Sequence, residues 1–383
     1  MTQNQSAPLI GFSTRVRKSP YFAATLRHGC KAYTVYNHMF MPVYYESPVA
    51  DYWRLITDVT LWDVAAERQV EITGPDAARF AQYLTPRNLS QCQVGQCKYV
   101  LLTDEAGGIV NDPVLLRLGE NHVWLSLADS DVLLWAKGIA HGSGMDVTLG
   151  EPDVSPMQVQ GPKSAAVMRR LFGDWVDDLK YFWFRETDLD GIPVVVSRTG
   201  WSGEKGYEIF LRDGQYGDQL WERVMEAGRE DNIGPCAPSQ IRRIEAGMLS
   251  YRNDMGLAEN PFELGLDRLV DLEQAADFVG KAALAAIRDQ GVTRRLVGVE
   301  IDAEPMIDYS SDKVPARDGA RTIGIVTSTV YSPRLEKNIG LAIVNTAYIE
   351  PGARFTLETP RGTATATVVP LPFFDPKKAI TRG

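Results

Sequence analysis

One local pattern occurs twice in the sequence, and its two copies start about 87 residues apart. Each time a predicted strand leads into Gly-Pro and then into a helical pattern, at Gly74-Pro75-Asp76-Ala77 and at Gly161-Pro162-Lys163-Ser164. A strand pair and a second helix follow, and the second helices are predicted over 132–139 and 216–227. The repeat therefore predicts a duplicated α+β unit, in which helices cover one face of an antiparallel sheet.

Each copy also contains a predicted β-hairpin. Its strands are 99–103 with 109–118 in the first copy, and 191–196 with 207–211 in the second. The hairpins occupy related positions in the repeat, so two units packed about a pseudo-twofold axis turn both hairpins toward one central cavity. We therefore expect four side chains to lie near one another: Tyr99, Asp112, Trp201 and Glu208.

The second hairpin turns through Gly200-Trp201-Ser202-Gly203-Glu204-Lys205-Gly206, whose glycines tolerate positive φ and close backbone approach. Side chains alternate along the returning strand, so Glu208 shares a face with Phe210 and points away from Tyr207. A carboxylate beside an aromatic ring suits a clamp that reads the N–H donors of a folate or purine. The alternative is an ordinary hairpin with Glu208 in solvent.

The composition changes near residue 290, where short strands begin to alternate with turns. These strands are predicted over 296–301, 321–328, 339–344, 354–358 and 363–369. Their spacing favours a small β-barrel or sandwich as the last domain. The predicted division of the chain is 1–52 with 153–260 as a first, discontinuous α+β domain, 53–152 as a second, and 261–383 as a linker and C-terminal β domain.

The charge and the apolar runs exclude some classes of protein. A net charge of −9 over 383 residues argues against sequence-independent nucleic-acid binding, which needs clustered Lys and Arg. No apolar run approaches the roughly 20 residues that cross a bilayer. The segment 1–8 is polar and lacks the apolar core of a signal peptide, so a cytoplasmic protein is predicted. The oligomeric state stays open, a homo-oligomer included.

A metal site is not expected. The chain has four cysteines and four histidines, in no metal-binding spacing: Cys30, Cys92, Cys97, Cys236, His28, His38, His122 and His141.

Taken together, the motifs resemble the aminomethyltransferase superfamily, whose founding member is the T-protein of the glycine cleavage system. They occur in the family's order: Met41-Pro42, Gly74-Pro75-Asp76-Ala77, Gly107-Gly108-Ile109-Val110-Asn111-Asp112, the Gly200–Glu208 stretch, Glu245-Ala246-Gly247-Met248 and Ser332-Pro333. The resemblance implies three domains arranged as a cloverleaf around a central opening that holds tetrahydrofolate. The chain departs from the family at Asn111, where an Asp is usual.

The resemblance also implies roles for single residues. Glu208 matches the family's pterin-binding Glu, and Asp112 matches its critical carboxylate. Tyr99 matches a folate-contacting Tyr, Arg243 matches an Arg near the same site, and Trp201 stands where the family usually has Tyr. The folate-binding set implied by the resemblance is therefore Tyr99, Asp112, Trp201, Glu208 and Arg243, with Asp112 as the catalytic residue.

Several stretches resemble one branch of the superfamily, the dimethylsulfoniopropionate demethylases. They are 31–37, 62–70, 85–87 and 130–138. That branch moves a methyl group from a sulfonium to N5 of tetrahydrofolate. The T-protein has Phe-x-Gly-Trp before its Met-Pro, whereas this chain has Tyr36-Asn37-His38-Met39. An aminomethyltransferase, a methylamine demethylase of the dimethylglycine type and a non-catalytic folate-binding protein are the alternatives.

A sulfonium or other onium methyl donor is a small cation, and aromatic faces attract cations. The candidates for such contacts are Tyr33, Tyr36, Trp183, Phe184 and Trp201. Taken singly, each is more often a core residue than a ligand. Trp201 is the strongest candidate because it stands at the entrance of a turn.

Overall fold

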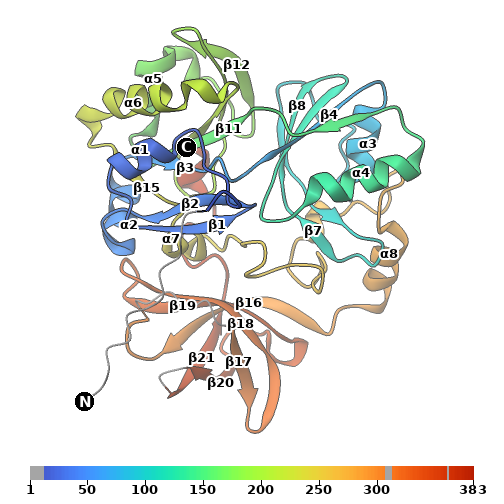
Figure 1. Cartoon of the computed structure of the whole chain (residues 1–383). Coiled ribbons are helices and arrows are strands. Elements are labelled where there is room, and N and C mark those ends of the chain that lie inside the picture. Colours follow the sequence, from blue (N-terminus) through green and yellow to red (C-terminus); the bar gives the residue numbers. More distant parts are fainter. Residues whose placement is uncertain (1–12, 307–312, 360–361) are drawn as a thin grey trace.

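The duplicated unit forms two separate, mainly antiparallel sheets in the computed structural model (Figure 1), with one parallel strand pair at the edge of the first. The structure describes residues 13–306, 313–359 and 362–383. The predicted lack of a signal peptide rests on residues 1–8, which lie outside these ranges.

The first sheet has six strands, and helices α5 (Ser164–Phe172) and α6 (Gly217–Ala227) cover one of its faces. In spatial order its strands are β12 (Phe184–Leu189), β13 (Ile192–Ser197), β14 (Gly206–Leu211), β11 (Ser155–Gln160), β3 (Thr60–Asp63) and β15 (Gly234–Cys236). Tyr207 and Ile209 of β14 point into the core under these helices. Phe210 points to the opposite face, as the predicted alternation requires.

The second sheet has five strands and is covered by α3 (Ala77–Tyr83) and α4 (Val132–Ser143). In spatial order its strands are β10 (Thr148–Gly150), β4 (Gln69–Thr73), β9 (His122–Ser126), β8 (Val114–Gly119) and β5 (Cys97–Tyr99). The uncovered faces of the two sheets pack together, with Trp124 of the second sheet in one cluster with Phe184 and Phe210 of the first. The helices therefore lie on the outside of a pair of stacked sheets.

The strand orders confirm the duplication but correct the predicted equivalence of the hairpins. The order β4-β9-β8-β5 in one sheet corresponds to β11-β14-β13-β12 in the other. The counterpart of the β13–β14 hairpin is thus the β8–β9 hairpin. The prediction that the hairpin of 99–103 with 109–118 corresponds to it is wrong. The physical reason is that the first copy has extra residues between β5 and β8, among them β7 (Ile109–Asn111), where the second copy has only the turn 190–191 between β12 and β13. Pro113, which lacks an N–H, separates β7 from β8. β7 pairs with β6 (Leu102–Thr103) in a small sheet of its own.

The N-terminal elements pack beside the six-stranded sheet. They are α1 (Phe22–Arg27), the antiparallel pair β1 (Ala32–Tyr36) and β2 (Met39–Tyr44), and α2 (Pro48–Thr57). The predicted domain boundary at 52/53 precedes β3, yet β3 pairs with β11 of the six-stranded sheet. We propose that the boundary between the two α+β domains follows residue 63.

The C-terminal domain is a closed six-stranded barrel, joined to the rest by α7 (Gln240–Glu245), an irregular stretch and α8 (Lys281–Gln290). Its strands, in spatial order, are β16 (Arg294–Asp302), β19 (Lys337–Asn345), β18 (Arg321–Ser332), β17 (Val314–Asp318), β20 (Arg354–Thr359) and β21 (Gly362–Val369). All five predicted strands are present, and β17 is additional. Figure 1 shows the barrel as a third lobe below the two sheet domains, which agrees with the predicted three-domain arrangement.

Candidate functional site

Glu208 lies in the interior of the six-stranded sheet, on β14, opposite Gln158 of β11 and Ser197 of β13. Its side chain is 4% exposed. The carboxylate accepts hydrogen bonds from Gln158 Nε2 at 2.9 Å and from the Thr199 hydroxyl. Burial raises the pKa of Glu208, and these two hydrogen bonds oppose the rise. Glu208 is therefore a fixed acceptor, and the alternative of a solvent-exposed hairpin carboxylate is wrong.

The turn before Glu208 is built around two glutamines of β11. Gln160 Oε1 accepts from Ser202 Oγ at 2.6 Å, and a Cβ at Gly206 would lie only 2.0 Å from the same oxygen. Gln158 Oε1 accepts from the Trp201 backbone N–H at 3.3 Å while its Nε2 holds Glu208. A single amide thus fixes the spacing between Trp201 and Glu208.

Asp112 lies in the break between β7 and β8. Its Oδ2 accepts a hydrogen bond from the Tyr99 hydroxyl at 2.9 Å. Its Oδ1 is buried and has no hydrogen-bond partner among the described residues. Burial raises the pKa of Asp112 to about 7, and the Tyr99 hydrogen bond opposes the rise. Asp112 therefore combines a free buried acceptor with a carboxyl group that titrates near neutral pH.

Glu67 connects the two predicted carboxylates and was missed by the sequence analysis. It lies in the turn after β3, where its backbone N–H donates to the Val64 carbonyl at 2.8 Å. Burial raises its pKa well above the usual range, and repulsion from Glu208 and then Asp112 raises it further. The charges of Glu208 and Asp112 both act on Glu67, and the expected proximity of Asp112 and Glu208 to each other stays a prediction. The only local signal was a charged residue directly after the buried run 59–66.

The two tyrosines of β1, Tyr33 and Tyr36, have different surroundings. Burial raises the pKa of Tyr36, the negative charges of Glu67, Asp112 and Asp129 add to the rise, and a hydrogen bond from the Asp129 backbone opposes it. Tyr33 packs instead against Phe22, with ring centroids 5.2 Å apart, and its hydroxyl bonds to Thr25. The predicted contacts of Tyr33 and Tyr36 with a methyl donor remain predictions, and the charges of two site carboxylates act on Tyr36.

Trp183 and Phe184 lie where the two sheets meet. Trp183 forms a β-bridge with Gln96, and the Lys180 ammonium lies 5.9 Å from the centre of its ring. Phe184 is 7% exposed and packs in the cluster between the sheets. The structure gives Phe184 a core position, and its predicted contact with a substrate remains a prediction.

Arg243 of α7 is buried and its guanidinium is fully engaged by the protein. Nη1 donates to Asp254 at 2.6 Å, Nη2 to the Ser328 hydroxyl at 2.7 Å, and Nε to Gln240 at 2.8 Å. Arg243 thus anchors α7 to the barrel. The charge of its partner Asp254 contributes to the raised pKa of Asp112, so this anchor lies behind the site.

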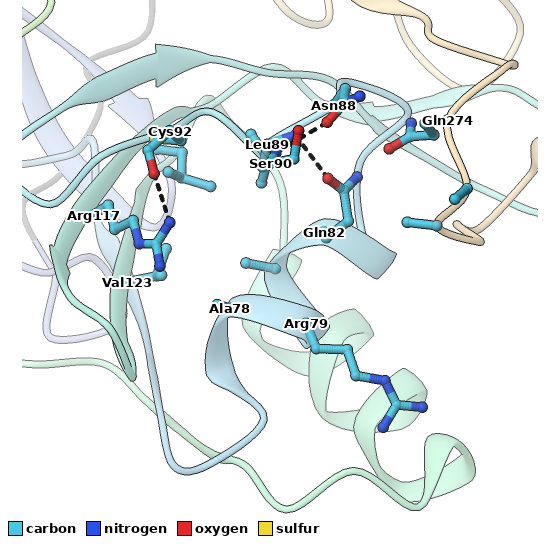
Figure 2. A pocket seen from close by; sticks show the side chains of 14 residues that line it. Ala78, Arg79, Gln82, Asn88, Leu89, Ser90, Cys92, Arg117, Val123 and Gln274 are labelled. Carbon is cyan, nitrogen blue, oxygen red and sulfur yellow. Dashed lines mark hydrogen bonds between the residues drawn. The ribbon is translucent and has the colours of Figure 1, made fainter.

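A cavity of about 460 Å³ lies elsewhere, between α3 and the loop that follows it. Figure 2 shows hydrogen bonds between residues of this cavity. Gln82 Oε1 of α3 accepts one from the Leu89 backbone N–H, and Arg117 Nη1 of β8 donates another to the Cys92 carbonyl. None of the predicted site residues lines this cavity.

Two further observations concern metals and membranes. Across the described ranges, no group of three or more His, Cys, Asp or Glu side chains is placed to hold a metal ion. None of the helices in the described part of the chain has the length and apolar character that a membrane crossing requires.

The comparison with known families follows the division seen in the structure. The family model of the GCVT N-terminal domain matches residues 21–274, which hold both sheets. The chain belongs to the glycine cleavage T-protein family. The model of the glycine cleavage T-protein C-terminal barrel domain matches residues 294–375, which form the third lobe.

Individual members of the T-protein family resemble the chain over nearly its whole length. Dimethylsulfoniopropionate demethylase of Ruegeria pomeroyi is 40% identical and covers 93% of this chain and 97% of its own. Aminomethyltransferase of Alkaliphilus metalliredigens is 31% identical over 88% of this chain and 91% of its own. The crystal structure of glycine cleavage system aminomethyltransferase T from Bartonella henselae matches with a TM-score of 0.84, at 22% identity, over 94% and 98% of the two chains.

Membership of the T-protein family confirms the predicted class of activity. The chain is an enzyme that transfers a one-carbon unit to tetrahydrofolate, and the prediction of a small-molecule substrate agrees with this class. The site fits such a carrier, because a pterin presents N–H donors. Asp112 Oδ1 is a buried acceptor without a donor among the described residues, and Glu208 is a second buried carboxylate, held by Gln158 and Thr199.

Proposed function

We propose that the chain is a demethylase that transfers a methyl group from the sulfonium of dimethylsulfoniopropionate to N5 of tetrahydrofolate. The products are methylmercaptopropionate and 5-methyltetrahydrofolate. The observation that carries the proposal is the 40% identity to a dimethylsulfoniopropionate demethylase over 93% of the chain. Aminomethyltransferases of Desulfitobacterium hafniense and Alkaliphilus metalliredigens are 29% and 31% identical. An aminomethyltransferase and a methylamine demethylase remain as outcomes of the test.

Three of the predicted residues are proposed to hold the carrier. Glu208 accepts N–H donors of the pterin, since a carboxylate has lone pairs left after bonding to Gln158 and Thr199. Asp112 accepts through Oδ1, and Tyr99 fixes its orientation through Oδ2. When bound, tetrahydrofolate supplies the nucleophilic nitrogen that takes the methyl group.

The methyl donor is a cation, and the proposed donor site is aromatic and acidic. The charges of Glu67 and Asp112 act on Tyr36, and Trp201 stands at the turn held by Gln158. Each cation–π contact contributes about 0.5–2 kcal/mol. Trp183 and Phe184 stay further candidates, and Phe184 lies in one cross-strand row with Ser197 and Glu208. Tyr33 is engaged with Phe22 and Thr25.

The methyl transfer requires that the methyl donor be aligned with N5 of tetrahydrofolate and that one group accept a proton. A sulfonium leaves as a neutral thioether, so the leaving group needs no acid. Methylation of a secondary amine nitrogen releases one proton, and a carboxylate with a pKa of about 7 suits its removal. We assign this role to Asp112. Alignment of two bound reactants is worth up to roughly 7–11 kcal/mol in intramolecular systems.

The products test the proposal. Incubation with dimethylsulfoniopropionate and tetrahydrofolate is expected to give methylmercaptopropionate and 5-methyltetrahydrofolate in equal amounts, measured by chromatography and proton spectra. Omission of tetrahydrofolate is the control and is expected to abolish both products. The methylene product together with ammonia from an aminomethyl donor would instead establish an aminomethyltransferase. Turnover of dimethylglycine alone would establish a methylamine demethylase.

Several expectations remain predictions. Activity without a bound metal ion is checked by chelation, which is expected to leave turnover unchanged. A cytoplasmic location and the oligomeric state, a homo-oligomer included, are also untested.

A further inference from the structure

The segment after the barrel returns to the six-stranded domain. Figure 1 shows the C-terminal end within the lobe of that domain, whereas the barrel strands lie below it. The segment ends in a short helix, α9 (Ala379–Arg382), whose first N–H groups bond to the carboxylate of Asp375 at 2.9 and 3.0 Å. The range matched by the family's barrel model stops at residue 375, so α9 lies outside it.

Arg198 joins this segment to the glycine-rich turn. It directly follows β13, and its side chain is 4% exposed. Its Nη2 donates to the carbonyl oxygens of Thr381 at 3.2 Å and Gly383 at 2.9 Å. Its Nη1 donates to the carbonyl of Gly206 at 3.0 Å. A single guanidinium therefore binds both the segment and the last residue of the turn.

A second link is made in the middle of the turn. The Gly203 carbonyl accepts from Thr381 Oγ at 3.1 Å and from Arg242 Nη2 at 2.7 Å. Gly203 has a φ of +70°, and a Cβ there would lie 3.0 Å from the Ala246 Cβ, so the position favours glycine. The turn is thus held between α7 and the C-terminal segment.

We infer that residues 379–383 are a positioning element of the tetrahydrofolate site, acting through Arg198 and Gly203 on the 200–206 turn. The turn carries Trp201 and leads directly into Glu208, so a shift of the turn redirects both side chains. The inference rests on the proposed role of this site in binding tetrahydrofolate. The segment acts through the turn and is not assigned a contact with the ligand.

The test removes the links in two steps. Deletion of 379–383 is expected to weaken tetrahydrofolate binding, measured by calorimetry, by roughly tenfold or more. Thr381→Val is expected to weaken it about three- to fivefold, as the loss of one net hydrogen bond of about 1 kcal/mol predicts. In both variants the 200–206 amides are expected to exchange hydrogen faster than in the parent. Thr356→Val is the matched control, because it removes an equal 3.1 Å hydroxyl–carbonyl bond within the barrel.

The outcomes separate this inference from the proposed function. Unchanged affinity with unchanged exchange at 200–206 overturns the inference, and so does a lower melting temperature with normal affinity and exchange. A parent protein that does not bind tetrahydrofolate contradicts the proposed function, while the exchange measurement, which needs no ligand, still decides whether the segment holds the turn. If the deletion variant fails to fold, the tetrahydrofolate affinity and amide exchange of Thr381→Val, compared with those of Thr356→Val, decide the question.

Discussion

The two halves of the duplicated unit present their carboxylates in different ways. Glu208 stands within a continuous strand, and both of its oxygens are bonded by neighbours on the same sheet or at its edge. Asp112 stands where Pro113 interrupts a strand, and one of its oxygens has no partner among the described residues. A carboxylate within a continuous strand, such as Glu208, is held by hydrogen bonds from neighbours on the sheet or at its edge. A carboxylate at a strand break, such as Asp112, keeps an oxygen that can exchange a proton. We expect Glu208 to govern affinity and Asp112 to govern turnover.

The largest expected effect is that of Asp112→Asn. The amide cannot take a proton, so kcat is expected to fall roughly 10²- to 10⁴-fold. Tetrahydrofolate affinity is expected to change much less than kcat. Steady-state kinetics and calorimetry measure the two, and Glu105→Gln, an exposed carboxylate in the β6–β7 loop, is the control. A full kcat in Asp112→Asn would remove the assigned proton acceptor.

Glu208→Gln is expected to show the converse pattern. Loss of a charge-assisted hydrogen bond costs about 1.5–3 kcal/mol, which corresponds to roughly ten- to hundredfold weaker binding of tetrahydrofolate. Calorimetry measures the change, with Glu186→Gln on exposed β12 of the same sheet as the control. If Glu208→Gln lowers kcat and leaves the affinity intact, the contrast between the two carboxylates is wrong.

The pH dependence sharpens the contrast further. Asp112 has a pKa of about 7, and only its ionised form accepts a proton, so kcat/KM is expected to rise with pH through about 7 and then level off. Tyr99 stabilises the ionised form by donating to it, so Tyr99→Phe is expected to raise this pKa and move the rise to higher pH. Tyr348→Phe, which removes a hydroxyl–carboxylate bond in the barrel domain, is expected to leave the profile in place.

The smallest effect is expected for Glu67→Gln. Burial and two neighbouring carboxylates favour the protonated form of Glu67, and glutamine resembles that form. Turnover and affinity are therefore expected to stay within about threefold of the parent values. A loss as large as that of Glu208→Gln would show that Glu67 works as a third ionised carboxylate.

The sequence predicted those parts of the fold and site that follow from the internal repeat and from the alternation of side chains along a strand. The Gly-Pro repeat located both α+β units, and the period of two placed Glu208 and Phe210 on one face of β14. The predicted proximity of Asp112 and Glu208 used a wrong equivalence of hairpins and stays a prediction. The error arose because the first copy carries the extra strands β6 and β7 between β5 and β8, where the second copy has only the turn 190–191.

The missed parts depend on contacts distant in sequence or on unusual local patterns. Strand β17 was missed because it contains Pro315 and ends in charged residues, which are typical of a loop. Glu67 stands beside Arg68 in an ordinary polar pair of the sequence, and only the fold buries it where the charges of Glu208 and Asp112 act on it. Arg198 and the C-terminal segment are more than 180 residues apart, and no local period connects them.

The pairing of β3 with β11 has a consequence for how the protein is made. β3 is synthesised before the entire five-stranded domain, and its partner β11 follows about 90 residues later. During translation the nascent chain therefore carries an unpaired strand, Thr60–Asp63, which is buried in the finished fold, while a complete domain folds beyond it. We expect the five-stranded domain to fold first and to bring β3 and β11 together, which shortens the loop that the later domain must close.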